Sequence, residues 1–381
     1  MTRKEKNDNY SNVVKYIFSH YDEKRGIIID LIHGNDLNQL ISYISKIDNF
    51  DFKNLNYENF NIIYYLDKSI NNDINTNIKN YISMGKILLA GVGGNLGSEA
   101  AKILLTLEDK NNLIFCSSHE ETLKKYTNMG IETHVVDFNY YDNLEEVFRN
   151  VDTIGLISMP FVGEKRQAAH KNVIDAAKSV GVKKIVYTSL VNASDETNPS
   201  IEKLDHDFTE KYIKSVGMNY IFLRLNIPFS NNSGDGHMAY ISRKDCAKAL
   251  AIALHKANKY DHTTIDINGK ELLSMKEFIE IGNKVTGNHV TYREISDEEN
   301  YKELDAQGVP RTTDGIFATD APTPFCSDGI VSFGKAIRLE KFAIHTNDFK
   351  KLTGDDPIPV SYMFANSKDF EIGERHSKDK K

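Results

Sequence analysis

The chain of 381 residues has three cysteines and no tryptophan. Cys116, Cys246 and Cys326 lie far apart, form no C-x-x-C pair and are odd in number, which argues against a disulfide framework and for a reducing compartment. Metal-ligand spacings such as H-E-x-x-H are also absent, so we expect no metal site.

The sequence also lacks a basic excess and long apolar runs. It carries 47 Lys and Arg against 54 Asp and Glu, a net charge of −7, so nucleic acid is a poor candidate partner. No apolar run approaches the roughly 18 residues of a membrane-spanning helix, and the first residues do not resemble a signal peptide. We therefore expect a cytoplasmic protein with a small-molecule partner and no membrane contact, and homo-oligomer formation is left open.

The character of the sequence changes near residue 85. Residues 1–84 are rich in Asn, Asp, Ile and Tyr, and we expect a small α/β appendage of unknown role. Residues 85–365 are predicted to form a dinucleotide-binding domain, in which about 226–242 and 268–365 make a smaller C-terminal substrate lobe. Residues 366–381 are a polar tail.

From Lys86 onward, short apolar strands alternate with helical segments, which predicts an α/β, Rossmann-type, doubly wound parallel sheet covered on both faces. The predicted strands are 86–90, 113–117, 132–137, 152–158, 183–189, 220–224 and 263–268. After them we expect a helix near 276–285 and a strand at 289–295. An irregular segment at 315–331 is expected to cover a substrate crevice.

The main functional signal is the segment GVGGNLG, which follows the first predicted strand and opens a helix. Gly91, Gly94 and Gly97 allow a tight turn and let backbone N–H groups approach a pyrophosphate, whose charge the helix dipole favours. In this context the loop predicts a dinucleotide site, and a tight turn without a ligand is the alternative.

The second predicted strand lacks an acidic residue at its end, where a carboxylate would accept hydrogen bonds from the ribose of NAD. Ser117, Ser118 and His119 stand there instead, and they could donate to a 2′-phosphate. We therefore expect NADP(H) to be favoured over NAD(H). Ser118 and Glu121 also have capping-box spacing, so Ser118 could serve only the helix.

Further polar residues follow the later strands, where Rossmann folds bind their cofactor. Asp137 could accept from the adenine amino group or cap a turn. No Tyr–Lys pair of the short-chain dehydrogenase kind stands in a suitable place, and His206 is the remaining candidate for a catalytic group, with a structural role as the alternative. The other candidates are Ser158, Met159 and Pro160 after the fourth strand and Thr188 and Ser189 after the fifth.

Several segments match one family in order, among them GVGGNLGSEA, HKNVIDAAKSVGVKKIVYTSL and LDHDFTEKYIKSVGMNY. From about Lys86 to Phe364 the sequence resembles the NmrA-like branch of the atypical short-chain dehydrogenases, and within it the NAD(P)H:quinone oxidoreductase-like proteins. The resemblance implies a pyrophosphate site at Gly91, Gly94, Asn95, Leu96 and Gly97. It also implies an acceptor site near His206 and Asn226.

The sequence departs from this family at three places. Ser117 replaces the usual Arg after the second strand, the chain between Asn232 and Gly234 is shorter by about one helix, and residues 1–84 have no counterpart. The expected function is an NAD(P)H-dependent oxidoreductase that passes hydride to a quinone-like or conjugated small molecule. A redox-sensing regulator that binds NAD(P) without turnover and an isoflavone-reductase-like double-bond reductase are the alternatives.

Overall fold

The computed structural model describes residues 85–160, 162–226, 230, 232–312 and 326–370. The chain divides into two units, Met1–Met84 and Gly85–Lys381, and the fold described below belongs to the second. The expected N-terminal appendage and the part of the polar tail beyond residue 370 lie outside the described residues.

Seven parallel strands form the central sheet, in the order β3-β2-β1-β4-β5-β6-β8. The strands are β1 (Lys86–Ala90), β2 (Leu113–Ser117), β3 (Glu132–Val135), β4 (Val151–Leu156), β5 (Lys184–Leu190), β6 (Asn219–Leu225) and β8 (Thr263–Ile267). Every residue of β2 and of β5 is buried, as expected for strands covered on both faces. The predicted Rossmann-type fold is confirmed.

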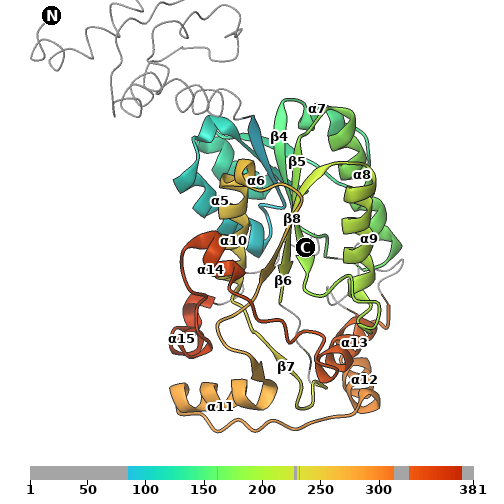
Figure 1. Cartoon of the computed structure of the whole chain (residues 1–381), viewed down its shortest axis with the longest axis vertical. Coiled ribbons are helices and arrows are strands. Elements are labelled where there is room, and N and C mark those ends of the chain that lie inside the picture. Colours follow the sequence, from blue (N-terminus) through green and yellow to red (C-terminus); the bar gives the residue numbers. More distant parts are fainter. Residues whose placement is uncertain (1–84, 161, 227–229, 231, 313–325, 371–381) are drawn as a thin grey trace, which may run out of the picture. The chain divides into compact units, whose positions relative to one another are not determined.

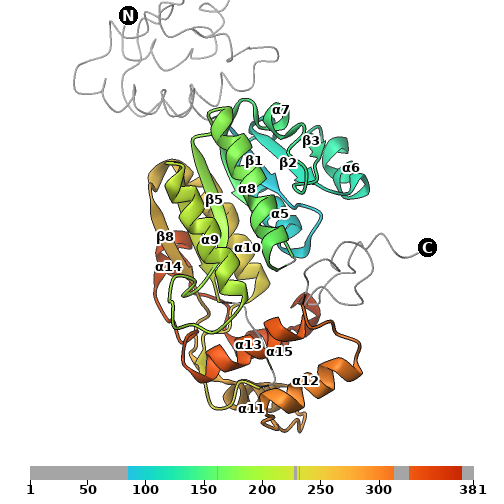
Figure 2. The ribbon, with the colours of Figure 1, turned by 90° about the vertical axis from the view of Figure 1, so that its right-hand side faces the viewer.

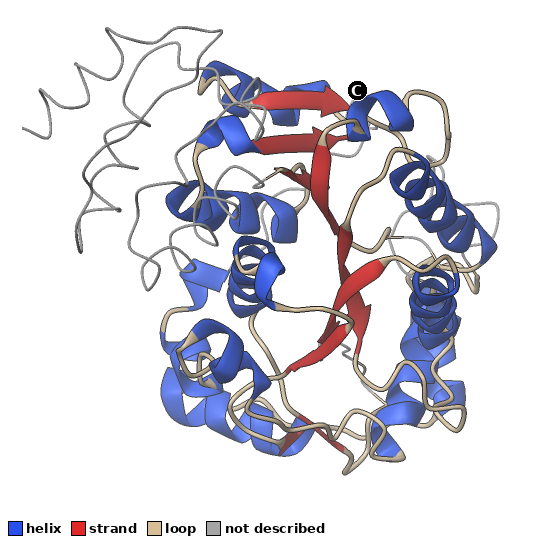
Figure 3. Ribbon diagram, turned by 45° about the horizontal axis from the view of Figure 1, so that its top comes forward, coloured by secondary structure: helices blue, strands red, loops and turns tan. Residues whose placement is uncertain are grey.

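Helices cover both faces of this sheet (Figures 1 and 3). One face carries α5 (Asn95–Leu107), α6 (Glu120–Asn128), α10 (Arg243–His255) and α14 (Asp348–Thr353), and the other carries α7 (Leu144–Phe148), α8 (Glu164–Ser179) and α9 (Glu202–Ser215). Successive side chains of β1 alternate between the two resulting cores, with Leu89 in the first and Leu88 in the second.

The strand order reverses between β1 and β4, since β2 lies on one side of β1 and β4 on the other. Crossover connections diverge at such a point and leave a crevice at the carboxyl ends of the two strands. The glycine loop follows β1 and the segment Ser158–Pro160 follows β4, so both of these predicted cofactor segments reach the same crevice.

A smaller lobe stands beyond the carboxyl ends of the strands (Figure 2). It contains β7 (His237–Met238) paired antiparallel with β9 (Leu273–Ser274), together with α11 (Met275–Thr286), α12 (Asp297–Ala306), α13 (Ser327–Arg338) and α15 (Val360–Ala365). Its own core contains Tyr240, Phe333, Phe342 and Val360. The helix α14 instead packs against α10 and β8, with Phe349 in the core of the sheet, so it belongs to the Rossmann part.

Two predictions for this lobe are wrong. Residues 289–295 form no strand, because Val290 bonds through both its N–H and its carbonyl to the side chain of Asn283 rather than to a neighbouring strand. Part of the segment 315–331 is not irregular: its residues 315–325 lie outside the described residues, whereas α13 begins at Ser327. Within the described residues, no helix is long and apolar enough to cross a membrane.

Candidate cofactor and acceptor site

The glycine loop is fixed to the neighbouring strand β2. The N–H groups of Gly91 and Val92 both donate to the carbonyl oxygen of Cys116, at 2.8 and 3.1 Å. Gly91 has φ +79°, a conformation that glycine adopts without strain, and its own carbonyl accepts from Gly94 at 3.0 Å. These hydrogen bonds set the turn through the backbone.

Two glycines of the motif have different reasons to be glycine. A Cβ on Gly97 would lie 2.1 Å from the carbonyl oxygen of Gly91, so this position must be glycine for the turn to close. A Cβ on Gly94 would lie 3.5 Å from the same oxygen, an ordinary contact, and Gly94 is exposed with φ −85°. The fold therefore tolerates a side chain at Gly94, and a ligand is the better reason for its absence.

The first turn of α5 presents unpaired donors. Its first backbone bond within the helix runs from Ser98 to Gly94, so the N–H groups of Asn95, Leu96 and Gly97 precede the ladder. No side chain caps this end and no acidic residue lies in its first turn. An anion placed here would meet three N–H groups and the positive end of the helix dipole.

The end of β2 differs from the prediction. The hydroxyl of Ser117 is buried, where it accepts from Thr122 Oγ1 at 2.7 Å and from the N–H of His119 at 3.2 Å. A Cβ on Gly93 would lie 2.6 Å from it, so Ser117 packs against the underside of the glycine loop. This geometry contradicts the expectation that Ser117 donates to a phosphate.

Ser118 is exposed, and its hydroxyl lies 2.9 Å from His119 Nδ1. The capping box expected for Ser118 with Glu121 is wrong, because the N-cap of α6 is His119 and no side chain caps it. Ser118 and His119 are thus the two polar side chains at this rim. Neither side chain caps α6, so both can form hydrogen bonds with a ligand.

Asp137, two residues after β3, is exposed. Its Oδ1 accepts from the N–H of Asn139 at 3.0 Å and from the side-chain amide of Asn139 at 2.7 Å. The carboxylate therefore caps the turn Asp137–Tyr140, and among the described residues no partner is bonded to Oδ2. α7 begins separately, behind Asn143 with φ +70°.

The turn after β4 is held by buried side chains. The N–H of Ser158 donates to Thr188 Oγ1 at 2.9 Å, and the N–H of Met159 donates to Nε2 of His170 on α8 at 3.1 Å. The N–H of Gly163 donates to the carboxylate of Asp205 on α9 at 2.8 Å. Thr188 thus supports the turn from below rather than facing a ligand.

Ser189 also points into the protein. Its hydroxyl donates to Glu210 Oε1 at 2.6 Å. Arg224 donates to the same carboxylate from Nε at 2.9 Å and from Nη2 at 2.7 Å. Asn226, at the end of β6, is fully buried and donates to the carbonyl of Phe342 at 2.9 Å. Its Oδ1 has no hydrogen-bond partner among the described residues.

His206 does not face the crevice as the sequence predicted. The residue is 6% exposed, and its Nδ1 lies 2.8 Å from the hydroxyl of Tyr187 in the middle of β5. Burial, followed by the nearby charge of Arg166, lowers the pKa of His206 well below its usual value. The ring is therefore neutral at physiological pH, and it lies behind the cavity wall rather than on it.

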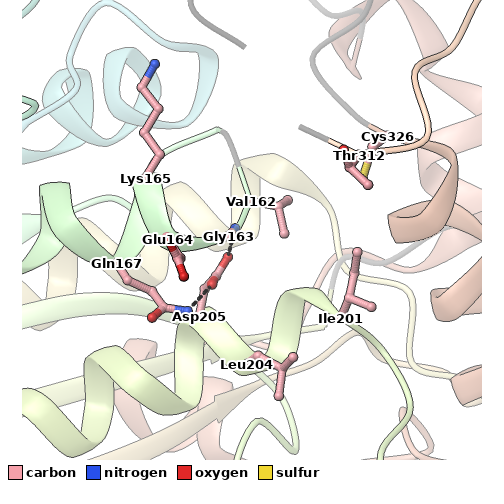
Figure 4. Close-up of a pocket in the computed structure, with 10 residues that line it drawn as sticks. All are labelled: Val162, Gly163, Glu164, Lys165, Gln167, Ile201, Leu204, Asp205, Thr312 and Cys326. Atoms are coloured by element: carbon pink, nitrogen blue, oxygen red, sulfur yellow. Dashed lines mark hydrogen bonds between the residues drawn. The ribbon is translucent and has the colours of Figure 1, made fainter. Parts of the chain in front are cut away.

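A cavity with a volume of about 590 Å³ lies next to Val162 and Gly163, which follow the turn after β4 (Figure 4). The starts of α8 and α9 form one side of it, and Thr312 and Cys326 of the C-terminal lobe form the other. Asp205 accepts from the Gly163 N–H and, at 2.7 Å, from the side-chain amide of Gln167. These bonds tie α9 to α8 and fix that wall (Figure 4).

Three residues of this site were missed from the sequence: His170, Gln167 and Asp205. A signal for them exists, because the buried face of α8 includes Arg166 and His170 among its small apolar residues. Polar side chains at such positions need buried partners, which here come from α9. Within the described residues, no group of three or more His, Cys, Asp or Glu side chains could hold a metal ion.

A parallel sheet with a glycine loop, a bare helix N-terminus and a cavity at the starts of α8 and α9 defines a Rossmann-type dinucleotide-binding protein. Residues 83–233 match the model of the NmrA-like family, so this part of the chain is an NmrA-like domain. The family resemblance predicted from the sequence is confirmed.

Individual relatives agree with this assignment. Quinone oxidoreductase 2 of Escherichia coli K12 is 27% identical over 241 residues, 59% of this chain and 82% of that protein. Prestalk A differentiation protein A of Dictyostelium discoideum is 23% identical over 291 residues, 71% of this chain and 88% of that protein. The solved structure of the E. coli NADPH-dependent quinone oxidoreductase complexed with NADPH has a TM-score of 0.65 at 23% identity and covers 74% of this chain and 99% of its own.

Proposed function

We propose that the chain is an NAD(P)H-dependent oxidoreductase that transfers hydride from the nicotinamide to a quinone-like or other conjugated small molecule. The observation that supports it most directly is the continuity between the glycine loop and the cavity. Ile157 links them, since its Cδ1 would lie 3.1 Å from a Cβ on Gly97. The chain then runs through Ser158–Pro160 to Val162 and Gly163 in the cavity wall.

The cofactor would lie along this track. Gly91 and Gly94 would leave room for the pyrophosphate, to which the N–H groups of Asn95, Leu96 and Gly97 would donate. Asp137 would accept from the adenine through Oδ2, the oxygen left free by its turn. Ser158, Met159 and Pro160 would lie against the ribose and nicotinamide, with Thr188 and Ser189 supporting them from within the protein.

NADP(H) is proposed as the preferred cofactor. No carboxylate stands at the end of β2 to repel a 2′-phosphate. Because Ser117 is buried, the phosphate contacts would come from the exposed hydroxyl of Ser118 and from the ring of His119. The solved E. coli relative is itself described as NADPH-dependent.

The cavity favours direct hydride transfer without a protein proton donor. Among the described residues that line it, there is no Tyr–Lys pair, and the carboxylate of Asp205 already accepts two hydrogen bonds. Tyr240 and Lys244 are four residues apart, as in the catalytic pair of short-chain dehydrogenases, but Tyr240 packs on Phe278 in the core of the C-terminal lobe and is not catalytic. A quinone suits such a site because its reduced oxygens take protons from water.

One alternative has a specific observation in its favour. The lack of a Tyr–Lys pair in the described cavity lining would also suit a regulator that binds NAD(P) without turnover, and a relative matched over 71% of this chain is named as a differentiation protein. The double-bond reductases that the family resemblance suggests carry a lysine near the position of His206, and Lys203 is the nearby candidate. A double-bond reductase is less favoured, because the ammonium group of Lys203 donates to the carbonyl of Asp195 at 2.8 Å. The cytoplasmic location of the chain and the formation of a homo-oligomer stay predictions.

The test is calorimetric titration of the purified chain with NADPH and NADH, followed by absorbance at the nicotinamide band with a panel of quinones. Tight binding of NADPH and its oxidation by a quinone are expected. Binding without oxidation by any acceptor would favour the regulator. Failure to bind either cofactor would refute the proposal, because the glycine loop would then be only a turn.

A further inference from the structure

The turn Ser158–Pro160 keeps its backbone donors away from the crevice. The N–H groups of Ser158 and Met159 are both bonded inward to buried side chains, and Pro160 has no N–H. Of the two acceptors, Thr188 is part of the neighbouring strand β5 and is held in the sheet. The acceptor for Met159 is instead His170, which reaches the turn from the helix α8.

The protonation of the His170 ring follows from its hydrogen bonds. The hydroxyl of Thr209 donates its only proton to the carbonyl oxygen of Asp205 at 2.7 Å. Since Thr209 Oγ1 also lies 2.9 Å from His170 Nδ1, that nitrogen must carry the proton and donate it. Nε2 is then the bare acceptor that the Met159 N–H requires, so Thr209 selects the tautomer that holds the turn.

The surroundings maintain this state. His170 is fully buried, and its ring meets Tyr187 edge-on with centroids 5.4 Å apart. Burial, followed by the charge of Arg166, lowers the pKa of His170 to about 3, so the ring remains neutral. Every hydrogen-bonding atom of the ring is occupied, which leaves none to touch a ligand.

We propose that His170 is a positioning residue, which sets through the Met159 backbone where the nicotinamide half of the cofactor lies. This inference depends on the proposed function. Hydride transfer requires reacting atoms within a few tenths of an ångström of their productive separation, so a shift of this turn would act on binding and rate together. The adenosine half would lie at the ends of β2 and β3, and neither hydrogen bond of His170 reaches those strands.

The test compares two ligands of the purified chain: NADPH, and adenosine 2′,5′-bisphosphate, which lacks the nicotinamide half. His170→Phe fills the space but leaves the Met159 N–H buried without an acceptor. We expect it to weaken NADPH by roughly tenfold and to change the bisphosphate by less than about twofold. His170→Gln keeps an amide oxygen for Met159 and an amide N–H for Thr209, so it should restore most of the NADPH affinity.

Val173→Ala is the matched control, because Val173 is fully buried on the same helix and belongs only to the hydrophobic core. It should lower stability without changing the ratio of the two affinities. A readout without cofactor comes from hydrogen exchange: the peptide that carries Met159 should exchange faster in His170→Phe, and at the wild-type rate in His170→Gln.

The outcomes are distinguishable from failure of the proposed function. If the wild type binds neither ligand, the proposed function fails and the inference fails with it. If the wild type binds both, equal weakening of the two ligands by His170→Phe would show a purely structural role and overturn the inference. Unchanged NADPH affinity in that variant would overturn it as well.

Discussion

The two buried imidazoles make the stability of the fold dependent on pH in a predictable direction. Burial lowers the pKa of His170 from 6.5 to about 3 and lowers that of His206 well below 6.5. Both rings are therefore neutral in the folded chain and become charged in the unfolded chain below pH 6.5. The unfolded state then binds more protons, so the free energy of unfolding falls as pH falls from about 6.5 towards 3.

The size of this effect follows from linkage. One ring that stays neutral in the fold and titrates near 6.5 when unfolded removes about 2 kcal/mol of stability between pH 7 and pH 5. His206 should add to this loss in the same direction, and the loss from His170 alone is a sizeable share of the 5–15 kcal/mol of a typical domain. Titrating carboxylates add their own contributions, which are shared by any variant that leaves them in place.

The difference between the wild type and His170→Gln isolates one ring. Urea unfolding can be followed by circular dichroism, since the chain has no tryptophan. Between pH 7 and pH 5, we expect the variant to lose about 2 kcal/mol less of its free energy of unfolding than the wild type. Val173→Ala should be less stable than the wild type at both pH values but lose the same amount between them. Equal losses in the wild type and His170→Gln would refute the reasoning, since His170 would then titrate in the fold as it does in water.

Three further predictions concern other parts of the site. Gly94→Val should abolish NADPH binding in calorimetry with little change in thermal stability, whereas the control Lys102→Val, at an exposed position of α5, should bind NADPH as the wild type does. Normal binding by Gly94→Val would contradict the glycine-loop site. Ser118→Asp should weaken NADPH and spare NADH, and an unchanged affinity ratio would show that Ser118 does not face the ribose. Glu210→Ala should lower the free energy of unfolding by about 3 kcal/mol, because it leaves the guanidinium of Arg224 without its carboxylate partner. A loss below about 1 kcal/mol in urea unfolding would show that the pair is solvated.

The sheet was predictable because its signals are local. The strands 86–90 and 113–117 were predicted with the bounds that the structure gives them, since each is a continuous apolar run that must be covered on both faces. The segment 289–295 has comparable β-forming residues, including Val290 and Tyr292. It is not a strand, because strand formation needs a free edge to pair with, and the sequence does not show which edges are available.

The site was predictable at its glycine loop and less so at its rims. After a strand ends, the direction of each side chain depends on how the chain turns, and Ser117 turns inward because Gly93 leaves room beneath the loop. The supporting residues His170 and Asp205 act between α8 and α9, which are far apart in sequence. Their pairing required the three-dimensional structure, although a histidine on a buried helix face already indicated an unseen partner.

The burial of all three thiols has a consequence for durability. Quinones react covalently with thiolates, so an enzyme that handles them risks inactivation by its own acceptor. Burial raises the pKa of Cys116, Cys246 and Cys326, which keeps the sulfurs protonated and poorly nucleophilic. Cys326, the one thiol in the cavity wall, is 2% exposed and accepts the Gly329 N–H. If the proposed quinone acceptor is the substrate, burial of the thiols should let the chain turn over at high concentrations of this electrophile without covalent inactivation.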